Sequence, residues 1–212
     1  KVEQEFTSTA SVQSKPLQTL KVEWKWPNPR LWDAGKPNLY TLQLAVKGSG
    51  VNTVYNQPFG FREFWVEGRK FFLNGTEFRL RPALHSDTWE GGTVEVSDKL
   101  IEGYVKAGYN IAEIWPWNHD EWGRWHFREF FSERADLKGF PIMAPALDIT
   151  GVAWTGQWNN RQLIDRWKQR MATEMRRYRN HPSVLMWATS PNFFGNGDDQ
   201  NPRRIGKRKV EG

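Results

Sequence analysis

The chain has 212 residues, of which 38% are hydrophobic, and it carries a formal net charge of +6, thirteen tryptophans and no cysteine. This length suffices for one or two compact domains, and without cysteine neither a disulfide framework nor a thiolate metal site can form. No run of about 18 apolar residues occurs, and no basic segment followed by an apolar one opens the sequence, so we expect a soluble protein without a membrane-spanning helix.

Residues 1–66 are predicted to form an all-β domain. From Tyr40 to Val46 apolar residues alternate with others, which is typical of a half-buried strand. Glycines on both sides of Ser49 then predict a hairpin turn. Short strands are expected at 2–10, 20–26, 39–46, 51–55 and 59–66. Several short strands separated by turns favour a β-sandwich.

Residues 67–212 follow a different pattern, in which strands alternate with helices after a hairpin at Asn74-Gly75. Strands are expected at 78–84, 111–115, 140–147 and 184–187. The last of them is continuously apolar, as in a strand covered on both faces. Four such strands joined by right-handed crossovers make a parallel sheet, which is either an open doubly wound sheet or half of an eight-stranded barrel.

Three helices are predicted between these strands. Ser97 is expected to cap the first, and Gly108 to end it in the left-handed conformation. Asn118, with Glu121 three residues later, is expected to cap the second, which Gly139 ends. The third helix carries an apolar stripe formed by Leu163, Ile164, Trp167, Met171, Met175 and Tyr178.

Much of the positive charge lies on the third helix. Its cations are Arg161, Arg166, Lys168, Arg170, Arg176, Arg177 and Arg179. Because their spacing leaves them opposite the apolar stripe, a solvated helix face is favoured over a nucleic-acid surface. A second basic cluster, at 203–209, is expected in a loop or at a frayed end, with an anion site as the alternative.

The sequence lacks the usual signatures of cofactor and metal sites. No glycine-rich turn follows any predicted strand, and Gly91-Gly92 lacks the spacing of a dinucleotide-binding turn. The four histidines, at 85, 119, 126 and 181, never form an i, i+4 pair on a helix, which disfavours a histidine-ligated metal. We therefore expect no cofactor and no metal.

Five motifs occur in one order along the chain. They are Pro37-Asn38-Leu39-Tyr40, Phe59-Gly60-Phe61-Arg62-Glu63, Leu73-Asn74-Gly75 followed by Arg79-Leu80-Arg81 and His85, Gly108-Tyr109-Asn110, and Arg179-Asn180-His181-Pro182-Ser183-Val184. Together they resemble glycoside hydrolase family 2, the group of β-galactosidases, β-glucuronidases and β-mannosidases. The resemblance implies an immunoglobulin-like β-sandwich at 1–66, followed at 67–212 by the N-terminal half of a (β/α)8 TIM barrel with about four strands.

The end of the fourth strand departs from the family pattern. The family has Trp-Ser-x-Gly-Asn-Glu there, with Glu as acid/base, whereas this chain has Trp187-Ala188-Thr189-Ser190-Pro191-Asn192. Asn192 stands at the acid/base position, or Phe193 does after a shift by one, and neither can donate a proton. A full barrel takes about 250 residues, and the family's nucleophile lies on a later strand than this chain contains. The chain alone is therefore expected to be inactive.

Candidate site residues lie at the C-terminal ends of the strands, where barrels bind ligands. The expected substrate-binding set is His85, Trp115, Trp117, Asn118, Asp148, Trp187 and Asn192, although the tryptophans can equally be core residues. Asp198 and Asp199, in the loop after the fourth strand, are candidate proton donors. Their alternatives are a solvated turn or a cation site, and Glu113 and Asp148 compete for the acid role.

The turn at 179–183 is interpreted as structural. Asn180 and His181 are expected to close the third helix and Pro182 to prevent its continuation, so His181 is not expected to be a catalyst.

The resemblance thus implies a fragment of a β-galactosidase-like glycoside hydrolase that acts on the glycosidic bonds of a carbohydrate. The alternative is a non-catalytic carbohydrate-binding or protein-interaction module derived from the same fold, and a basic nucleic-acid binder comes third. Neither nucleic acid nor a membrane is the expected partner. The rest of the barrel, or another chain, would be needed to cover the open edges of the sheet.

Overall fold

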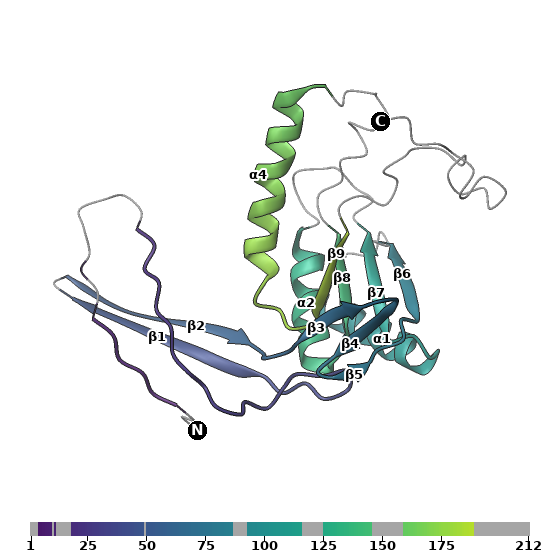
Figure 1. Ribbon diagram of the computed structural model, residues 1–212, viewed down its shortest axis with the longest axis horizontal. Helices are drawn as coiled ribbons and strands as arrows, with labels where there is room; N and C mark the ends of the chain where they lie inside the picture. Colours follow the sequence, from purple (N-terminus) through teal and green to yellow (C-terminus); the bar gives the residue numbers. More distant parts are fainter. Residues whose placement is uncertain are drawn as a thin grey trace. The chain divides into compact units, whose positions relative to one another are not determined.

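The computed structural model describes residues 4–9, 11, 18–48, 50–86, 93–115, 125–145 and 159–188 (Figure 1). The chain divides into two compact units, Lys1–Arg30 and Leu31–Gly212, each of which is described by itself. The expected boundary between domains at residues 66 and 67 stays a prediction.

The described residues of the first unit form no strand, so the strands expected at 2–10 and 20–26 are wrong there. Apolar and charged residues alternate from Leu20 to Trp26, yet Leu20 and Trp24 are 48% and 40% exposed. A single extended segment has no partner for its backbone groups, so alternation alone does not make it a strand. Within this unit Phe6 stacks on Trp24, with 5.1 Å between ring centroids.

The predicted hairpin is confirmed as strands β1 (Tyr40–Gly48) and β2 (Val51–Phe59). The two strands pair antiparallel from Tyr40 opposite Phe59 to Gly48 opposite Val51. The alternating apolar residues Leu42, Leu44 and Val46 lie on one face of this hairpin and are exposed. This face has no second sheet over it among the described residues.

A second antiparallel sheet contains β3 (Phe64–Glu67), β4 (Lys70–Leu73) and β5 (Thr76–Glu77). The Asn74-Gly75 turn is confirmed, with φ of 50° and 84°, as the primed hairpin turn requires. The strand expected at 59–66 is wrong in its middle, where Phe61 forms only an isolated bridge with Leu31. The expected strand is interrupted at residues 60–63, because these residues contact a segment far along the chain, as described below.

The third sheet is parallel, as predicted, and contains β6 (Pro82–Ser86), β7 (Ile111–Trp115), β8 (Ile142–Pro145) and β9 (Val184–Ala188). The order is β6-β7-β8-β9, and all three neighbouring pairs are parallel. The four arrowheads point the same way in Figure 1. The first strand starts at Pro82 rather than at residue 78, because proline tolerates the start of a strand better than its middle.

The described residues contain the helices α1 (Val94–Lys106), α2 (Trp125–Lys138) and α4 (Arg161–Tyr178). Thr93 caps α1 by accepting a hydrogen bond from the Val96 amide, so the cap expected at Ser97 is wrong. Ser97 lies within the helix and is fully buried. Gly108 and Gly139 follow their helices with φ of 88° and 63°, as predicted. Asn118 lies outside the described residues.

All three helices pack against one face of the parallel sheet. Side chains of β7 and β8 on that face, such as Ala112, Ile114 and Ile142, share one buried cluster with the helices through Ile101 of α1, Phe131 of α2 and Tyr178 of α4. The apolar stripe predicted for α4 is wrong at Met175.

Met175 is 37% exposed, while Glu174 is buried at 7%. Helical periodicity explains this, because position 174 lies one turn after Met171 and one turn before Tyr178, which are both buried.

Candidate functional site

The C-terminal edge of the parallel sheet is the candidate site. Ser86 is in register with Trp115, and Pro145 is in register with Ala188, so all four strands end on the same edge. The backbones of His85, Trp115 and Trp187 therefore lie near this edge. Trp117, Asn118, Asp148, Asn192, Asp198 and Asp199 lie outside the described residues. Convergence of the whole set stays a prediction.

Trp187 packs against the buried cluster on the helix side of the sheet and is partly buried. This contact favours the packing role that the sequence left open for it. His85 stands opposite Ile114, and its side chain is not described.

Glu113 is the one carboxylate that the four strands carry. It stands in register with Leu84 of β6 and Met143 of β8, and Met143 in turn pairs with Met186 of β9. Its neighbours Ala112 and Ile114 belong to the helix-side core, so strand alternation directs Glu113 to the opposite face. Glu113 is only partly exposed there.

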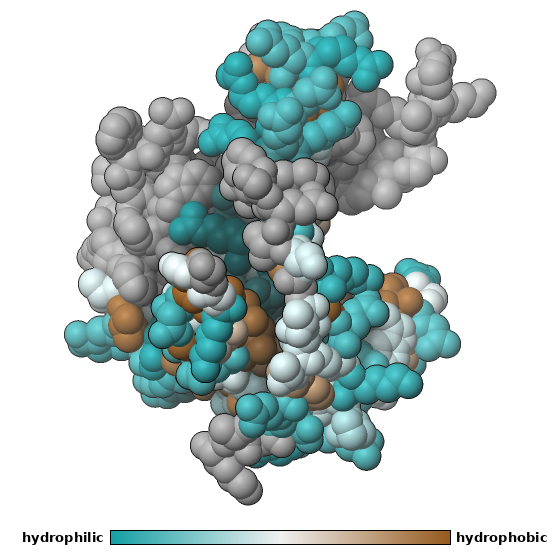
Figure 2. All heavy atoms as spheres, turned by 90° about the vertical axis from the view of Figure 1, so that its left-hand side faces the viewer, coloured by the Kyte–Doolittle hydropathy of each residue, from teal (hydrophilic) through white to brown (hydrophobic). Residues whose placement is uncertain are grey.

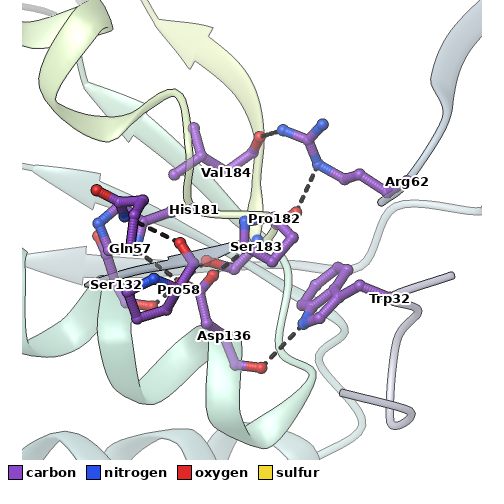
Figure 3. Close-up of polar contacts among 10 residues, drawn as sticks. All are labelled: Trp32, Gln57, Pro58, Arg62, Ser132, Asp136, His181, Pro182, Ser183 and Val184. Atoms are coloured by element: carbon purple, nitrogen blue, oxygen red, sulfur yellow. Dashed lines mark hydrogen bonds and ion pairs between the residues drawn. The ribbon is translucent and has the colours of Figure 1, made fainter. Parts of the chain in front are cut away.

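A polar cluster lies at the other edge, where β8 and β9 begin (Figure 3). Its centre is the Asp136 carboxylate near the end of α2, whose Oδ2 lies 2.6 Å from His181 Nδ1. Its Oδ1 accepts a hydrogen bond from the Ser183 amide at 2.9 Å. An ionised carboxylate only accepts, so with Asp136 ionised the hydrogen bond runs from His181 Nδ1–H to the carboxylate. The cluster thus ties α2 to the turn before β9.

Residues before β3 complete this cluster. The indole Nε1 of Trp32 donates to the Asp136 carbonyl at 2.9 Å. Arg62 Nε donates to the Pro182 carbonyl at 2.5 Å, and its Nη2 donates to the Val184 carbonyl. Burial lowers the pKa of Arg62, and the negative charge of Asp136 opposes that shift. The guanidinium thus donates to two backbone carbonyls at the start of β9.

Close packing accompanies these hydrogen bonds. A Cβ on Gly60 would lie 2.9 Å from Pro182 Cγ and 3.1 Å from Trp32 Cβ. Only glycine therefore lets residues 60–62 approach the turn before β9 so closely.

The cluster is built for structure rather than catalysis. An Asp-His-Ser arrangement is present, but Ser183 meets Asp136 through its backbone amide, and its Oγ contacts the Ser132 carbonyl at 3.5 Å. Ser183 is also fully buried, so no substrate reaches it. The four residue steps along β9 separate the cluster from the C-terminal edge by about 13 Å. These contacts support the structural interpretation of His181.

Sequence reasoning missed Asp136, although one signal was present. An acidic residue in the last turn of a helix is unfavourable next to the negative end of the helix dipole. Such a residue needs a compensating partner, and here His181 and the Ser183 amide provide it.

Among the residues that the structure describes, no group of three or more His, Asp or Glu side chains could hold a metal ion. None of the described helices is long and apolar enough to span a membrane.

The sequence of this chain is similar to those of known glycoside hydrolases. Residues 1–62 match the family model of the glycosyl hydrolases family 2. A putative β-glucuronidase from Formosa agariphila is 28% identical over 210 residues, covering 92% of this chain and 24% of the relative. The β-galactosidase BoGH2A from Bacteroides ovatus is 29% identical over 164 residues, covering 76% of this chain and 19% of the relative. These similarities support membership of glycoside hydrolase family 2.

Solved structures are similar to this chain in fold. A β-glucuronidase from Parabacteroides merdae superimposes with a TM-score of 0.58 at 21% identity, covering 80% of this chain and 20% of that protein. An exo-chitosanase from Amycolatopsis orientalis gives a TM-score of 0.58 at 21% identity, covering 74% and 19%. The chain thus spans about a quarter or less of the length of these relatives.

Proposed function

We propose that the chain is part of a longer glycoside hydrolase and that residues 67–212 form the first half of its (β/α)8 barrel. The order of the parallel sheet carries this proposal. A doubly wound sheet reverses its strand order at a switch point and has helices on both faces. Here β6 to β9 follow one another without reversal, and α1, α2 and α4 all contribute to the buried cluster on one face. A barrel has this arrangement, with helices outside only.

Residues 1–66 are proposed to form the immunoglobulin-like sandwich that precedes the barrel. The exposed apolar row of Leu42, Leu44 and Val46 supports this proposal, because a second sheet over that face would bury it. In the same way, the outer edges of the parallel sheet would be covered by the remaining barrel strands or by another chain.

The proposed reaction is hydrolysis of a glycosidic bond in a carbohydrate, as the names of the relatives indicate. A retaining mechanism needs two carboxyl groups about 5 Å apart, one as acid/base and one as nucleophile. Asn192 cannot supply the acid, so we assign that role to Asp198 or Asp199, with Glu113 and Asp148 as competitors. The nucleophile would come from a later strand of the longer protein. His85, Trp115, Trp117, Asn118, Asp148 and Asn192 would line the substrate site, while Trp187 packs against the buried cluster.

The second candidate is a carbohydrate-binding module without catalysis, and the amide at position 192 favours it. Turnover of p-nitrophenyl β-galactoside, β-glucuronide and β-mannoside by the full-length protein separates the two. Hydrolysis of any of them supports the enzyme. Binding of the parent sugars in calorimetry, without hydrolysis, would establish the module and overturn the proposed activity.

A further inference from the structure

The solvent face of α4 carries a row of arginines. Arg166, Arg170 and Arg177 are separated by four and seven residues, so they lie above one another along the helix and span about 16 Å. All three are exposed, while Met171, Glu174 and Tyr178 on the other side are buried. We call these three residues the α4 arginine row. The upper end of α4 in Figure 1 lies at the top of Figure 2, where the surface is mainly hydrophilic.

The charge at Arg166 and Arg170 is poorly compensated, unlike the charge at Arg134 and Lys138 of α2. Between α1 and α2, Arg134 pairs with Asp98 at 2.7 Å and Lys138 pairs with Glu102 at 2.8 Å. On α4, Lys168 lies 3.6 Å from Asp165. Within the described part of the chain, Arg166 and Arg170 have no carboxylate partner.

Like charges four residues apart destabilise a helix, so Arg166 and Arg170 together lower the stability of α4. On α1 and α2, the like charges four residues apart, Asp98 with Glu102 and Arg134 with Lys138, are compensated by ion pairs between the two helices. An anionic ligand on the row would remove the repulsion.

The neighbours of the row are suited to a sugar polymer. The exposed side chains of Gln162, Gln169 and Thr173 lie beside it and can hydrogen-bond hydroxyl groups. Arginine binds carboxylates through two parallel hydrogen bonds, which lysine cannot form. Trp167 is only partly exposed and Tyr178 is buried, so the row offers no aromatic platform for nucleic-acid bases.

We propose that the α4 arginine row binds an anionic polysaccharide whose sugars carry carboxylates. The choice of a sugar polymer rests on the proposed function. The helix lies on the outer side of the sheet, so this surface is separate from the strand ends where substrate would be cleaved. The row would hold a polymer chain on the protein while its end is processed elsewhere.

The test measures binding of the full-length protein to immobilised alginate, a polymer of uronates, at increasing salt. We expect salt-sensitive binding, and we expect Arg166→Gln together with Arg170→Gln to weaken it roughly tenfold, because each exposed ion pair contributes up to about 1 kcal/mol. The matched control, Lys47→Gln with Arg69→Gln, removes two exposed charges from other surfaces and should bind like the wild type. Circular dichroism checks that both double variants are folded.

Equal weakening in both double variants would overturn the proposal, since net charge alone would then explain binding. Absence of alginate binding, or tighter binding to double-stranded DNA of equal charge, would overturn it too. Neutral dextran should not bind. Hydrolysis of p-nitrophenyl glycosides is measured separately: activity without alginate binding contradicts only the arginine row, and alginate binding without activity contradicts only the proposed enzyme.

Discussion

Trp32 and Asp136 are 104 residues apart in the sequence, yet the Trp32 indole donates a buried hydrogen bond to the Asp136 carbonyl at 2.9 Å. Trp32 is fully buried. The carbonyl belongs to the last turn of α2, where it also accepts a long hydrogen bond of 3.4 Å from the Gly139 amide. This one contact therefore fixes the residues before β1 to the end of a helix in the parallel-sheet region.

Replacement of Trp32 by phenylalanine should destabilise the protein by about 1–3 kcal/mol. The smaller ring keeps much of the apolar contact but leaves the Asp136 carbonyl without its indole donor. Urea unfolding followed by fluorescence measures the change. Trp65→Phe is the matched control, because Trp65 is exposed and its stacking on Phe72 can persist. Equal losses in the two variants would show that ring volume, and not the hydrogen bond, matters at position 32.

Gly60→Ala should lower stability by about 1–3 kcal/mol, because its new Cβ would press on the Pro182 ring and on Trp32. Gly103→Ala is the opposite case. Gly103 lies inside α1, and a methyl group added there would meet no atom within 4 Å, so alanine should stabilise the helix by up to about 1 kcal/mol. Thermal unfolding of both variants checks the two signs. A neutral or stabilising Gly60→Ala would contradict the close approach of residue 60 to Pro182.

His181→Ala should cost about 1–3 kcal/mol, because Asp136 would lose a partner in a largely buried place. His181→Asn should recover part of this stability, since the asparagine amide can place a donor near the position of Nδ1. His181→Gln should also lower stability more than it lowers ligand affinity. Unfolding and sugar binding are measured side by side. A variant with unchanged stability but lost sugar binding would refute the structural role.

Asp98 gives a prediction for pH. The hydrogen bonds from Arg134 lower the pKa of Asp98, and the charges of Arg134 and Lys138 lower it further. Because the folded pKa lies below the unfolded value, the stabilisation is complete above the unfolded value and disappears as pH falls through the folded one. Asp98→Asn should therefore cost about 1 kcal/mol near pH 7 and progressively less below about pH 4.

Urea midpoints between pH 2 and pH 7 test this dependence. Glu95→Gln is the comparison, because the pair that Glu95 forms with Lys99 is about three-quarters exposed and is screened by solvent. A cost at Asp98 that stays the same from pH 2 to pH 7 would show that the charge of the carboxylate is not what stabilises the helix pair.

The elements predicted correctly from sequence are those set by local rules. Asn74-Gly75 and Gly108 adopt positive φ because few other residues tolerate it, so the turn and the helix end were visible in the sequence. The parallel strand at 184–188 was visible as an apolar run. The cap of α1 could not be identified from the sequence, because Thr93 and Ser97 are both good caps and only the fold decides between them.

Features that depend on distant partners could not be predicted in this way. The hydrogen bonds of Asp136 with His181 and with Trp32 join segments 45 and 104 residues apart, and no local pattern encodes them. The interruption of the expected strand at Gly60 also depends on a distant partner, because Pro182 is close to Gly60 in space but not in the sequence. The site was predictable only as an edge of a sheet, because periodicity places strand ends but not the loops beyond them.

The last prediction concerns the source of the proton if the full-length protein is a glycosidase. Asp198→Asn, Asp199→Asn and Glu113→Gln are made separately, and turnover is measured with one glycoside that has a poor leaving group and one that has a good leaving group. Loss of the true acid should slow the poor leaving group by about 10²–10⁴-fold and the good one much less, because a good leaving group departs without protonation.

Glu113 is the competitor that the structure places most clearly, partly exposed on the face of the sheet away from the helices. A selective loss in Glu113→Gln, with both aspartate variants unchanged, would move the acid from the loop to β7. Unchanged turnover in both aspartate variants would rule out the loop at 198–199 as the source. An equal loss with both leaving groups would instead point to a role in substrate binding, because binding does not depend on how well the leaving group departs.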